Sequence, residues 1–92
     1  MPKLLIYQTI WVFTIFRTDV FENRKYIHVG RKGTVRLCKI WLEPVVEVAK
    51  SGELSVSEQR EVLQIVELYQ DNLIRQWDQF LTGQKIQTIR ID

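Results

Sequence analysis

The sequence predicts an α+β domain in which a mostly antiparallel sheet of about five strands packs against one long amphipathic helix, in the order β-β-β-β-α-β. Two observations lead to this fold class. Residues 4–49 are rich in β-branched and aromatic side chains interrupted by short turns, and residues 55–82 carry apolar side chains at helical spacing. The chain has 92 residues, of which 46% are hydrophobic, so we expect residues 1–92 to form a single domain.

The first expected strand is an apolar run at residues 4–16, whose Ile, Val, Trp and Phe content is typical of a strand buried on both faces. Because the run is long for one strand, we expect a bend near Gln8 and Thr9. It is shorter than the roughly 20 apolar residues that span a bilayer, and no small-residue cleavage site follows it. We therefore expect neither a membrane span nor a signal peptide, and a polar connection at residues 17–23.

Residues 25–30 and 34–42 predict the second and third strands, joined as a β-hairpin by the glycine-flanked turn at residues 30–33. If the strands close symmetrically about this turn, Val29 pairs with Thr34. Period-two alternation then divides the hairpin side chains between two faces. One face is expected to carry Tyr26, His28, Val35, Leu37, Lys39 and Trp41, and the other Ile27, Val29, Arg36, Cys38, Ile40 and Leu42.

Two shorter strands complete the expected sheet. Pro44 ends the third strand, because proline lacks a ladder donor and restricts the residue before it. Residues 45–49 then predict a fourth strand. After the helix, residues 86–91 have enough β-branched character for a closing strand.

The helix has clear start and stop signals. Ser55 and Glu58 have the spacing of a capping box, and Gly83 stands where a left-handed residue commonly ends a helix. Apolar side chains between them recur at three- and four-residue steps, which places them on one face. This core stripe comprises Val62, Val66, Tyr69, Leu73, Trp77 and Phe80.

Positive charge is concentrated in residues 23–42, which contain six of the 13 Lys and Arg residues and none of the 11 Asp and Glu residues. Such a cluster favours contact with a phosphate backbone or with an acidic partner, and Tyr7, Tyr26 or Trp41 offers a stacking surface. The alternative is a set of solvated charges that protect a sheet edge from aggregation. The candidate binding residues are Arg24, Lys25, Arg31, Lys32, Arg36, Lys39 and Tyr26.

His28 is the single histidine and the candidate catalytic residue. Histidine ordinarily titrates near neutrality, and the nearby cations would bind a scissile phosphate. This pattern favours a metal-independent ribonuclease in which Asp19 or Glu43 orients the imidazole. The alternative is a half-buried strand residue packed beside Val35 and Trp41.

Cysteine and histidine usage excludes several classes of site. The lone Cys38 cannot form an internal disulfide, so a reducing cytoplasm is the expected compartment. We expect Cys38 to be a small buried residue. No Cys/His cluster has metal-ligand spacing, so we expect no metal and no cofactor.

Four segments together carry a family resemblance. They are Tyr26-Ile27-His28-Val29, Ile40-Trp41-Leu42-Glu43-Pro44, Gly52-Glu53-Leu54 and Leu73-Ile74-Arg75-Gln76-Trp77-Asp78-Gln79-Phe80. Over about residues 15–91 the chain resembles the small bacterial family called domain of unknown function 4160. The resemblance implies a small bacterial or archaeal protein of unestablished activity, and some members resemble proposed toxins encoded beside an antitoxin-like partner.

The resemblance also bears on the histidine. Many members carry a His-x-His-Val element on the second strand, and here Tyr26 replaces the first histidine while His28 retains the second. This departure disfavours a role that needs two imidazoles, such as metal binding or paired acid-base catalysis.

We therefore predict a macromolecular-binding component of a toxin-antitoxin-like pair that uses the basic hairpin. The expected partner is a cognate antitoxin-like protein, or RNA or DNA, with no role for a membrane. The alternatives are the ribonuclease described above and a non-catalytic protein-protein interaction module. In the last case the acidic helix face would meet the hairpin of another copy in a homo-oligomer, through Glu61, Glu67, Asp71 and Asp78.

Overall fold

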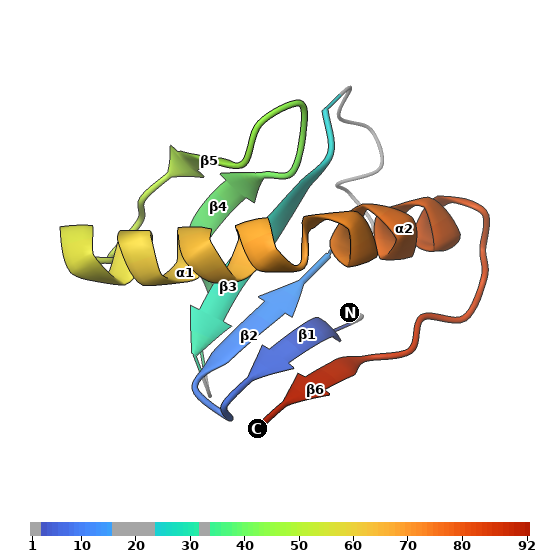
Figure 1. The fold of residues 1–92 in the computed structure, drawn as a ribbon, viewed down its shortest axis with the longest axis horizontal. Coiled ribbons are helices and arrows are strands. Elements are labelled where there is room, and N and C mark those ends of the chain that lie inside the picture. Colours follow the sequence, from blue (N-terminus) through green and yellow to red (C-terminus); the bar gives the residue numbers. More distant parts are fainter. Residues whose placement is uncertain (1–2, 16–23, 32–33) are drawn as a thin grey trace.

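The structure is a computed structural model that describes residues 3–15, 24–31 and 34–92, the last range without the side chains of residues 34–37. A six-stranded sheet carries two helices across one face (Figure 1). The strands are β1 (Lys3–Tyr7), β2 (Trp11–Thr14), β3 (Tyr26–Arg31), β4 (Thr34–Trp41), β5 (Glu47–Lys50) and β6 (Ile89–Ile91). The helices are α1 (Val56–Leu68) and α2 (Gln70–Leu81).

The strand order is β5-β4-β3-β2-β1-β6. Neighbouring strands are antiparallel except β6, which pairs parallel with β1. The α+β class is therefore confirmed, while the expected antiparallel sheet of about five strands is a mixed sheet of six. The last strand is also shorter than expected, since only Ile89–Ile91 of residues 86–91 pairs with a neighbour.

The expected first strand is in fact a hairpin. Gln8 and Thr9 adopt φ of 52° and 56°, so the chain reverses where only a bend was expected. The amide of Ile10 donates to the carbonyl of Tyr7 at 3.0 Å, which closes the turn. The apolar run thus supplies two central strands of the sheet, which explains why it is hydrophobic on both sides.

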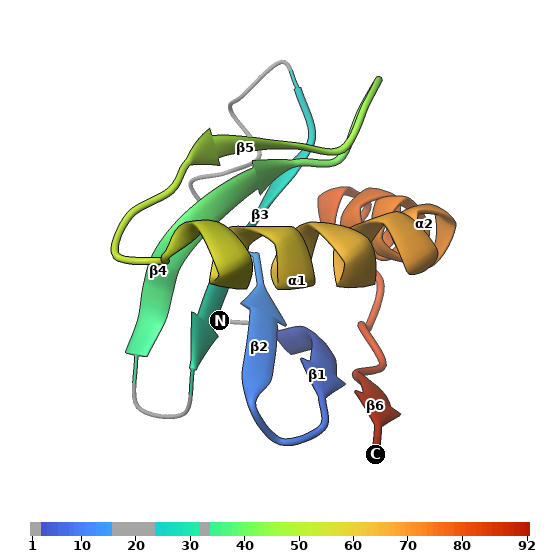
Figure 2. The same ribbon diagram turned by 60° about the vertical axis from the view of Figure 1, so that its left-hand side comes forward.

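The single long helix is also replaced by two helices. Tyr69 has φ −109° and ψ 17°, which ends α1 and precedes α2. The break lets the apolar stripe follow the twisted sheet, and Figure 2 shows the two helices lying across the same face. Both predicted ends are confirmed: Ser55 and Glu58 form a capping box, and Gly83 has φ 75°.

The pairing of β3 with β4 differs from the symmetric hairpin. Val29 pairs with Cys38 rather than with Thr34, and Thr34 pairs with Arg31 beyond an irregularity in β3. The register is therefore displaced by four residues, from position 34 to position 38. Because this displacement is even, the two predicted faces are retained for the residues whose side chains are described.

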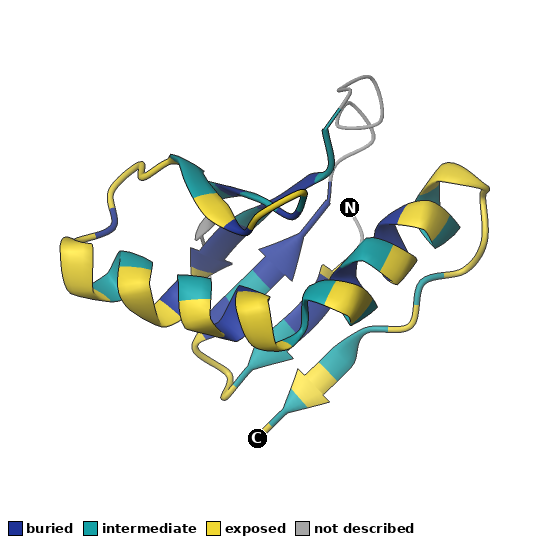
Figure 3. Ribbon diagram, turned by 45° about the horizontal axis from the view of Figure 1, so that its top comes forward, coloured by how far each residue is buried: buried dark blue, intermediate teal, exposed yellow. Residues whose placement is uncertain are grey.

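The core lies between the helices and the sheet. Ile27, Val29 and Ile40 are fully buried there beneath Val66 and Leu73. Figure 3 shows buried positions along the sheet under the helices and exposed positions on the outer side of the helices. In the described part of the chain, neither helix has the length and apolar character needed to cross a bilayer.

Candidate nucleic-acid interface

The sheet face opposite the helices, here called the rear face, carries one row of polar side chains. The ladder pairs Lys3 with Thr14, Thr14 with His28, His28 with Lys39, and Lys39 with Lys50. Directly paired residues project to the same face, so these five side chains form a cross-strand row from β1 to β5, which we call the rear row. Each lysine end of the row lies beside a register irregularity, one between Lys3 and Leu5 and one at Lys39 and Ile40, which interrupts the simple alternation of β1 and β5 there. With strands about 4.8 Å apart, the row is about 19 Å long.

The rear row contains three lysines and the single histidine. Lys3 and Lys50 at its ends are exposed, while His28 and Lys39 are half-buried. Thr14 is fully buried, and its hydroxyl has no hydrogen-bond partner within the described residues. The row is therefore most accessible to a ligand at its two lysine ends.

An aromatic cluster lies beside the row. Tyr26 pairs with Trp41 across β3 and β4, and their rings meet edge to face with centroids 5.5 Å apart. Tyr26 also meets the His28 ring edge to face at 5.4 Å. The Nζ of Lys39 lies 4.0 Å from the Tyr26 ring centroid and 4.5 Å from that of Trp41. Cation–π attraction thus holds a lysine of the row against the rings.

Arg24 completes this cluster from the start of β3. Its guanidinium lies 4.5 Å from the Trp41 ring centroid. Its Nε donates to the Glu43 carbonyl, and its Nη2 forms an ion pair with the Glu47 carboxylate. Three contacts therefore hold the guanidinium in one place, and one of them neutralises its charge.

Tyr26 was predicted as a stacking surface, and the structure buries it to 5% exposure. Its contacts are with the rings of His28 and Trp41 and with Lys39. Trp41 is half-buried and presents more of its ring at the surface. Tyr26 thus supports the cluster, and Trp41 is the aromatic side chain that a ligand would meet.

Two of the predicted cations lie on the opposite, helix-covered face. The Nζ of Lys25 lies 2.7 Å from Oδ1 of Asp78 in α2. Arg31 forms an ion pair with Glu58 at the start of α1, and its guanidinium lies 4.9 Å from the Trp11 ring centroid. These two cations connect the sheet to the helices.

The six hairpin cations therefore do not share one surface. Arg24 and Lys39 belong to the rear face, whereas Lys25 and Arg31 pair with helix carboxylates. Lys32 and the side chain of Arg36 lie outside the described part of the chain. The residues that sequence reasoning missed are Lys3 and Lys50, because only the ladder brings positions so far apart in the chain into one row.

His28 sits in the middle of the rear row, between Thr14 on β2 and Lys39 on β4. Of its two predicted carboxylate partners, Asp19 lies outside the described residues. Glu43 follows β4, and its backbone carbonyl accepts a hydrogen bond from Nε of Arg24. Among the described residues no group of three or more His, Cys, Asp or Glu side chains is arranged to hold a metal ion.

Cys38 projects to the helix side of the sheet and is 4% exposed, so the expectation of a small buried residue is confirmed. Burial raises the pKa of its thiol to about 11 from the ordinary 9.0. The thiol is protonated at neutral pH and is therefore a poor nucleophile.

Acidic side chains have the opposite distribution to the rear lysines. Glu61, Glu67 and Asp71 are exposed on the helices. The helices also carry the exposed cations Arg60 and Arg75, so their outer surface holds charges of both signs with the acids in excess. On balance an anionic ligand would be attracted more strongly to the rear face than to the acidic part of the helix surface.

Comparison with known proteins supports a family assignment. A family model described as a domain of unknown function, DUF4160, matches residues 11–78, from β2 into α2. Searches of curated proteins and of solved structures gave no match. The matched span contains four of the five residues of the rear row and leaves out Lys3.

Proposed function

The chain belongs to the domain of unknown function 4160 family. We propose that this member binds nucleic acid through the rear face of its sheet, and that single-stranded RNA is its preferred ligand. We propose further that it does so as one component of a toxin-antitoxin-like pair. The observation that carries the proposal is the rear row of three lysines beside Trp41.

Charge and geometry both support an RNA ligand. The row has lysines on β1, β4 and β5, and ammonium groups spaced in this way can follow a flexible phosphate backbone, because each is a point charge on a flexible side chain. An open sheet with helices on its other face is a known platform for single-stranded RNA, with aromatic rings stacking on bases. Trp41 provides such a ring at the surface, between Arg24 and Lys39. Contacts of this kind tolerate many sequences.

The test is charge reversal at the two exposed ends of the row. Lys3→Glu/Lys50→Glu should weaken binding of a labelled single-stranded RNA of about 12 nucleotides by about tenfold or more at low salt. Each lost phosphate contact should also flatten the salt dependence by about 0.7 in the slope of log K against log salt. Fluorescence anisotropy over a salt series measures both quantities.

Arg60→Glu is the matched control for the single variants Lys3→Glu and Lys50→Glu, because it changes net charge by the same amount as either of them and Arg60 is exposed on α1, away from the rear face. An equal loss of RNA affinity in Arg60→Glu would show that the effect comes from net charge alone, and would refute the rear-face site. Absence of RNA retention by the native protein at low salt would refute the RNA proposal. A stable complex with a coexpressed antitoxin-like protein, sensitive to Lys3→Glu/Lys50→Glu, would then assign the rear face to protein binding.

A metal-independent ribonuclease is the second candidate. It is favoured by the position of His28 beside Lys39 in the rear row, where an imidazole would meet a bound phosphate. Cleavage of RNA in EDTA by the native protein and by His28→Ala tests it. Loss of cleavage with RNA binding retained would support the enzyme. Equal cleavage by both proteins, or none by either, would remove it.

A further inference from the structure

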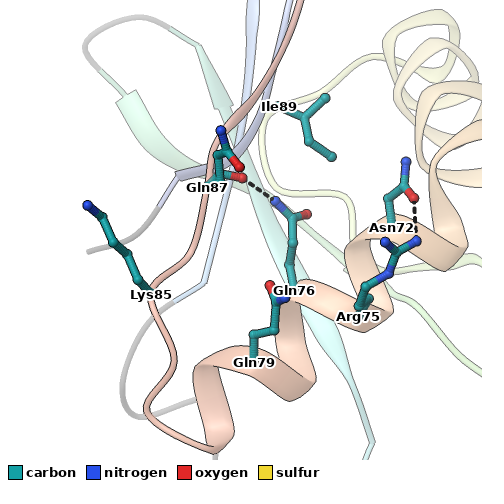
Figure 4. A pocket seen from close by; sticks show the side chains of 7 residues that line it. All are labelled: Asn72, Arg75, Gln76, Gln79, Lys85, Gln87 and Ile89. Atoms are coloured by element: carbon teal, nitrogen blue, oxygen red, sulfur yellow. Dashed lines mark hydrogen bonds between the residues drawn. The ribbon is translucent and has the colours of Figure 1, made fainter.

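A second site lies away from the rear face, between α2 and the segment that leads into β6. It is a pocket of about 350 Å³, which is within the usual range for small-molecule sites. Four amide side chains, two cations and Ile89 line it (Figure 4). None of these residues belongs to the rear row or to its aromatic cluster.

Gln76 is the buried residue of this pocket, with 5% exposure. Its Nε2 donates to the carbonyl of Leu4 at 2.9 Å and to that of Gln87 at 3.0 Å. The amide cannot be turned over, because its oxygen would then face two carbonyl oxygens. The orientation of Oε1 as an acceptor is therefore determined by two neighbouring elements.

That amide oxygen has no hydrogen-bond partner within the described residues. In Figure 4 it points toward the side of the pocket where Asn72 and Arg75 lie. A buried acceptor of this kind is uncommon, and a water molecule or a ligand in the pocket can supply the donor. A ligand of the pocket should therefore present an N–H or O–H group to Gln76.

The charges of the pocket indicate an anion. Arg75 projects from α2 and Lys85 from the segment after it, and no carboxylate lines the pocket. Within the described part of the chain, neither cation forms an ion pair, and Arg75 donates only to Oδ1 of Asn72 at 3.0 Å. Their positive charge is available to a phosphate or carboxylate.

The remaining polar groups suit a base edge. Gln79 and Gln87 each offer a donor and an acceptor at the pocket, as asparagine and glutamine do when they pair with the edge of a nucleobase. Ile89 adds an apolar contact for a flat ring. A ligand that combines an anion with a planar edge of donors and acceptors matches all of these groups.

We propose that this pocket binds a nucleoside monophosphate. Arg75 and Lys85 bind the phosphate, and an N–H group of the base donates to Oε1 of Gln76. The site goes beyond RNA binding at the rear face and does not depend on it. It would let the protein respond to a free nucleotide, or hold a terminal nucleotide of a bound strand.

The test is titration of the full chain with each of the four ribonucleoside monophosphates, followed by calorimetry and by NMR of the side-chain amides. We expect saturable binding with a Kd of about 1 mM or tighter, accompanied by a shift of the Gln76 amide signals. Arg75→Ala and Lys85→Ala should each weaken binding by about fivefold or more. Both residues are exposed, so the variants should fold.

Control ligands and variants decide between the possible outcomes. Inorganic phosphate or ribose 5-phosphate that binds as tightly as the nucleotides would show that no base is recognised, and would overturn the proposal. Arg60→Ala is the matched control variant. An equal loss of nucleotide affinity in Arg60→Ala would show that the effect comes from net charge alone, and would overturn the proposal. No heat and no shift with any nucleotide up to about 5 mM would also overturn it.

The two proposals fail separately. Lys3→Glu/Lys50→Glu should leave mononucleotide binding unchanged while it weakens RNA binding. Arg75→Ala should weaken mononucleotide binding and leave RNA binding unchanged. A loss of mononucleotide binding in Lys3→Glu/Lys50→Glu would move the nucleotide to the rear face and refute the pocket.

Discussion

Arg24 and Lys25 are neighbours in the chain whose side chains lie on opposite faces of the sheet. Arg24 contacts Trp41 and Glu47 on the rear face, whereas Lys25 crosses to Asp78 of α2. Strand alternation separates adjacent residues in this way. Only about half of the charged residues counted along a strand therefore lie on any one face of the sheet.

Cys38 allows a prediction for stability against pH. Below about pH 9 the thiol is protonated in both the folded and the unfolded chain. Between about pH 9 and pH 11 only the unfolded chain loses the proton, because burial raises the folded pKa to about 11. The free energy of unfolding should therefore fall as the pH rises through this window.

Urea unfolding of native protein and of Cys38→Ala at several pH values measures this contribution. Lysines and tyrosines titrate in the same window and affect both proteins, so the difference between them isolates the thiol. The stability advantage of the native protein over Cys38→Ala should shrink as the pH rises. A constant difference up to about pH 11 would contradict the raised pKa.

At the scale of elements, the chain changes direction at two places that carry no glycine or proline. Gln8 and Thr9 reverse the chain between β1 and β2, and Tyr69 separates α1 from α2. Left-handed φ is costly for a β-branched residue such as Thr9, so tertiary pairing of both strands must outweigh the local preference. The sequence predicts the helix ends well because Ser55 and Gly83 act locally, whereas these two breaks depend on distant contacts.

Trp77 is one of the side chains that attach α2 to the sheet, and it provides the prediction at this scale. It is 2% exposed, and its Nε1 donates to the carbonyl of Tyr26 at 2.9 Å. Trp77→Ala should lower the free energy of unfolding by about 3 to 5 kcal/mol in urea denaturation. Trp77→Phe should cost less, because it keeps most of the buried ring and removes only the hydrogen bond.

Leu81→Ala serves as the comparison, since Leu81 lies at the end of the same helix and is 47% exposed. Its loss should stay within about 1 kcal/mol. A loss of under about 1 kcal/mol for Trp77→Ala would show that α2 does not depend on this contact.

At the scale of the whole molecule, the sequence predicts the sheet and helix layers better than it predicts the order and pairing register of the strands. Apolar periodicity identifies the hairpin strands, the helical stripe and the buried Trp77, because these depend on neighbours in the chain. The rear row unites Lys3, His28 and Lys50, which only strand order and pairing bring together. The pocket likewise combines α2 with the segment before β6, and no spacing in the sequence marks Gln76 as its buried acceptor.

The parallel pairing of β1 with β6 has a consequence for how the chain folds. Leu5 pairs with Ile89, and the amide of Gln8 donates to the carbonyl of Ile91, so this ladder joins positions near the two ends of the sequence. Contacts of such long sequence separation slow folding, because a large loop must close before they form. During synthesis the outer edge of β1 stays unpaired until residues 89–91 have been made. A nascent chain would therefore expose an unpaired strand edge, which favours association with other chains, until residues 89–91 are in place.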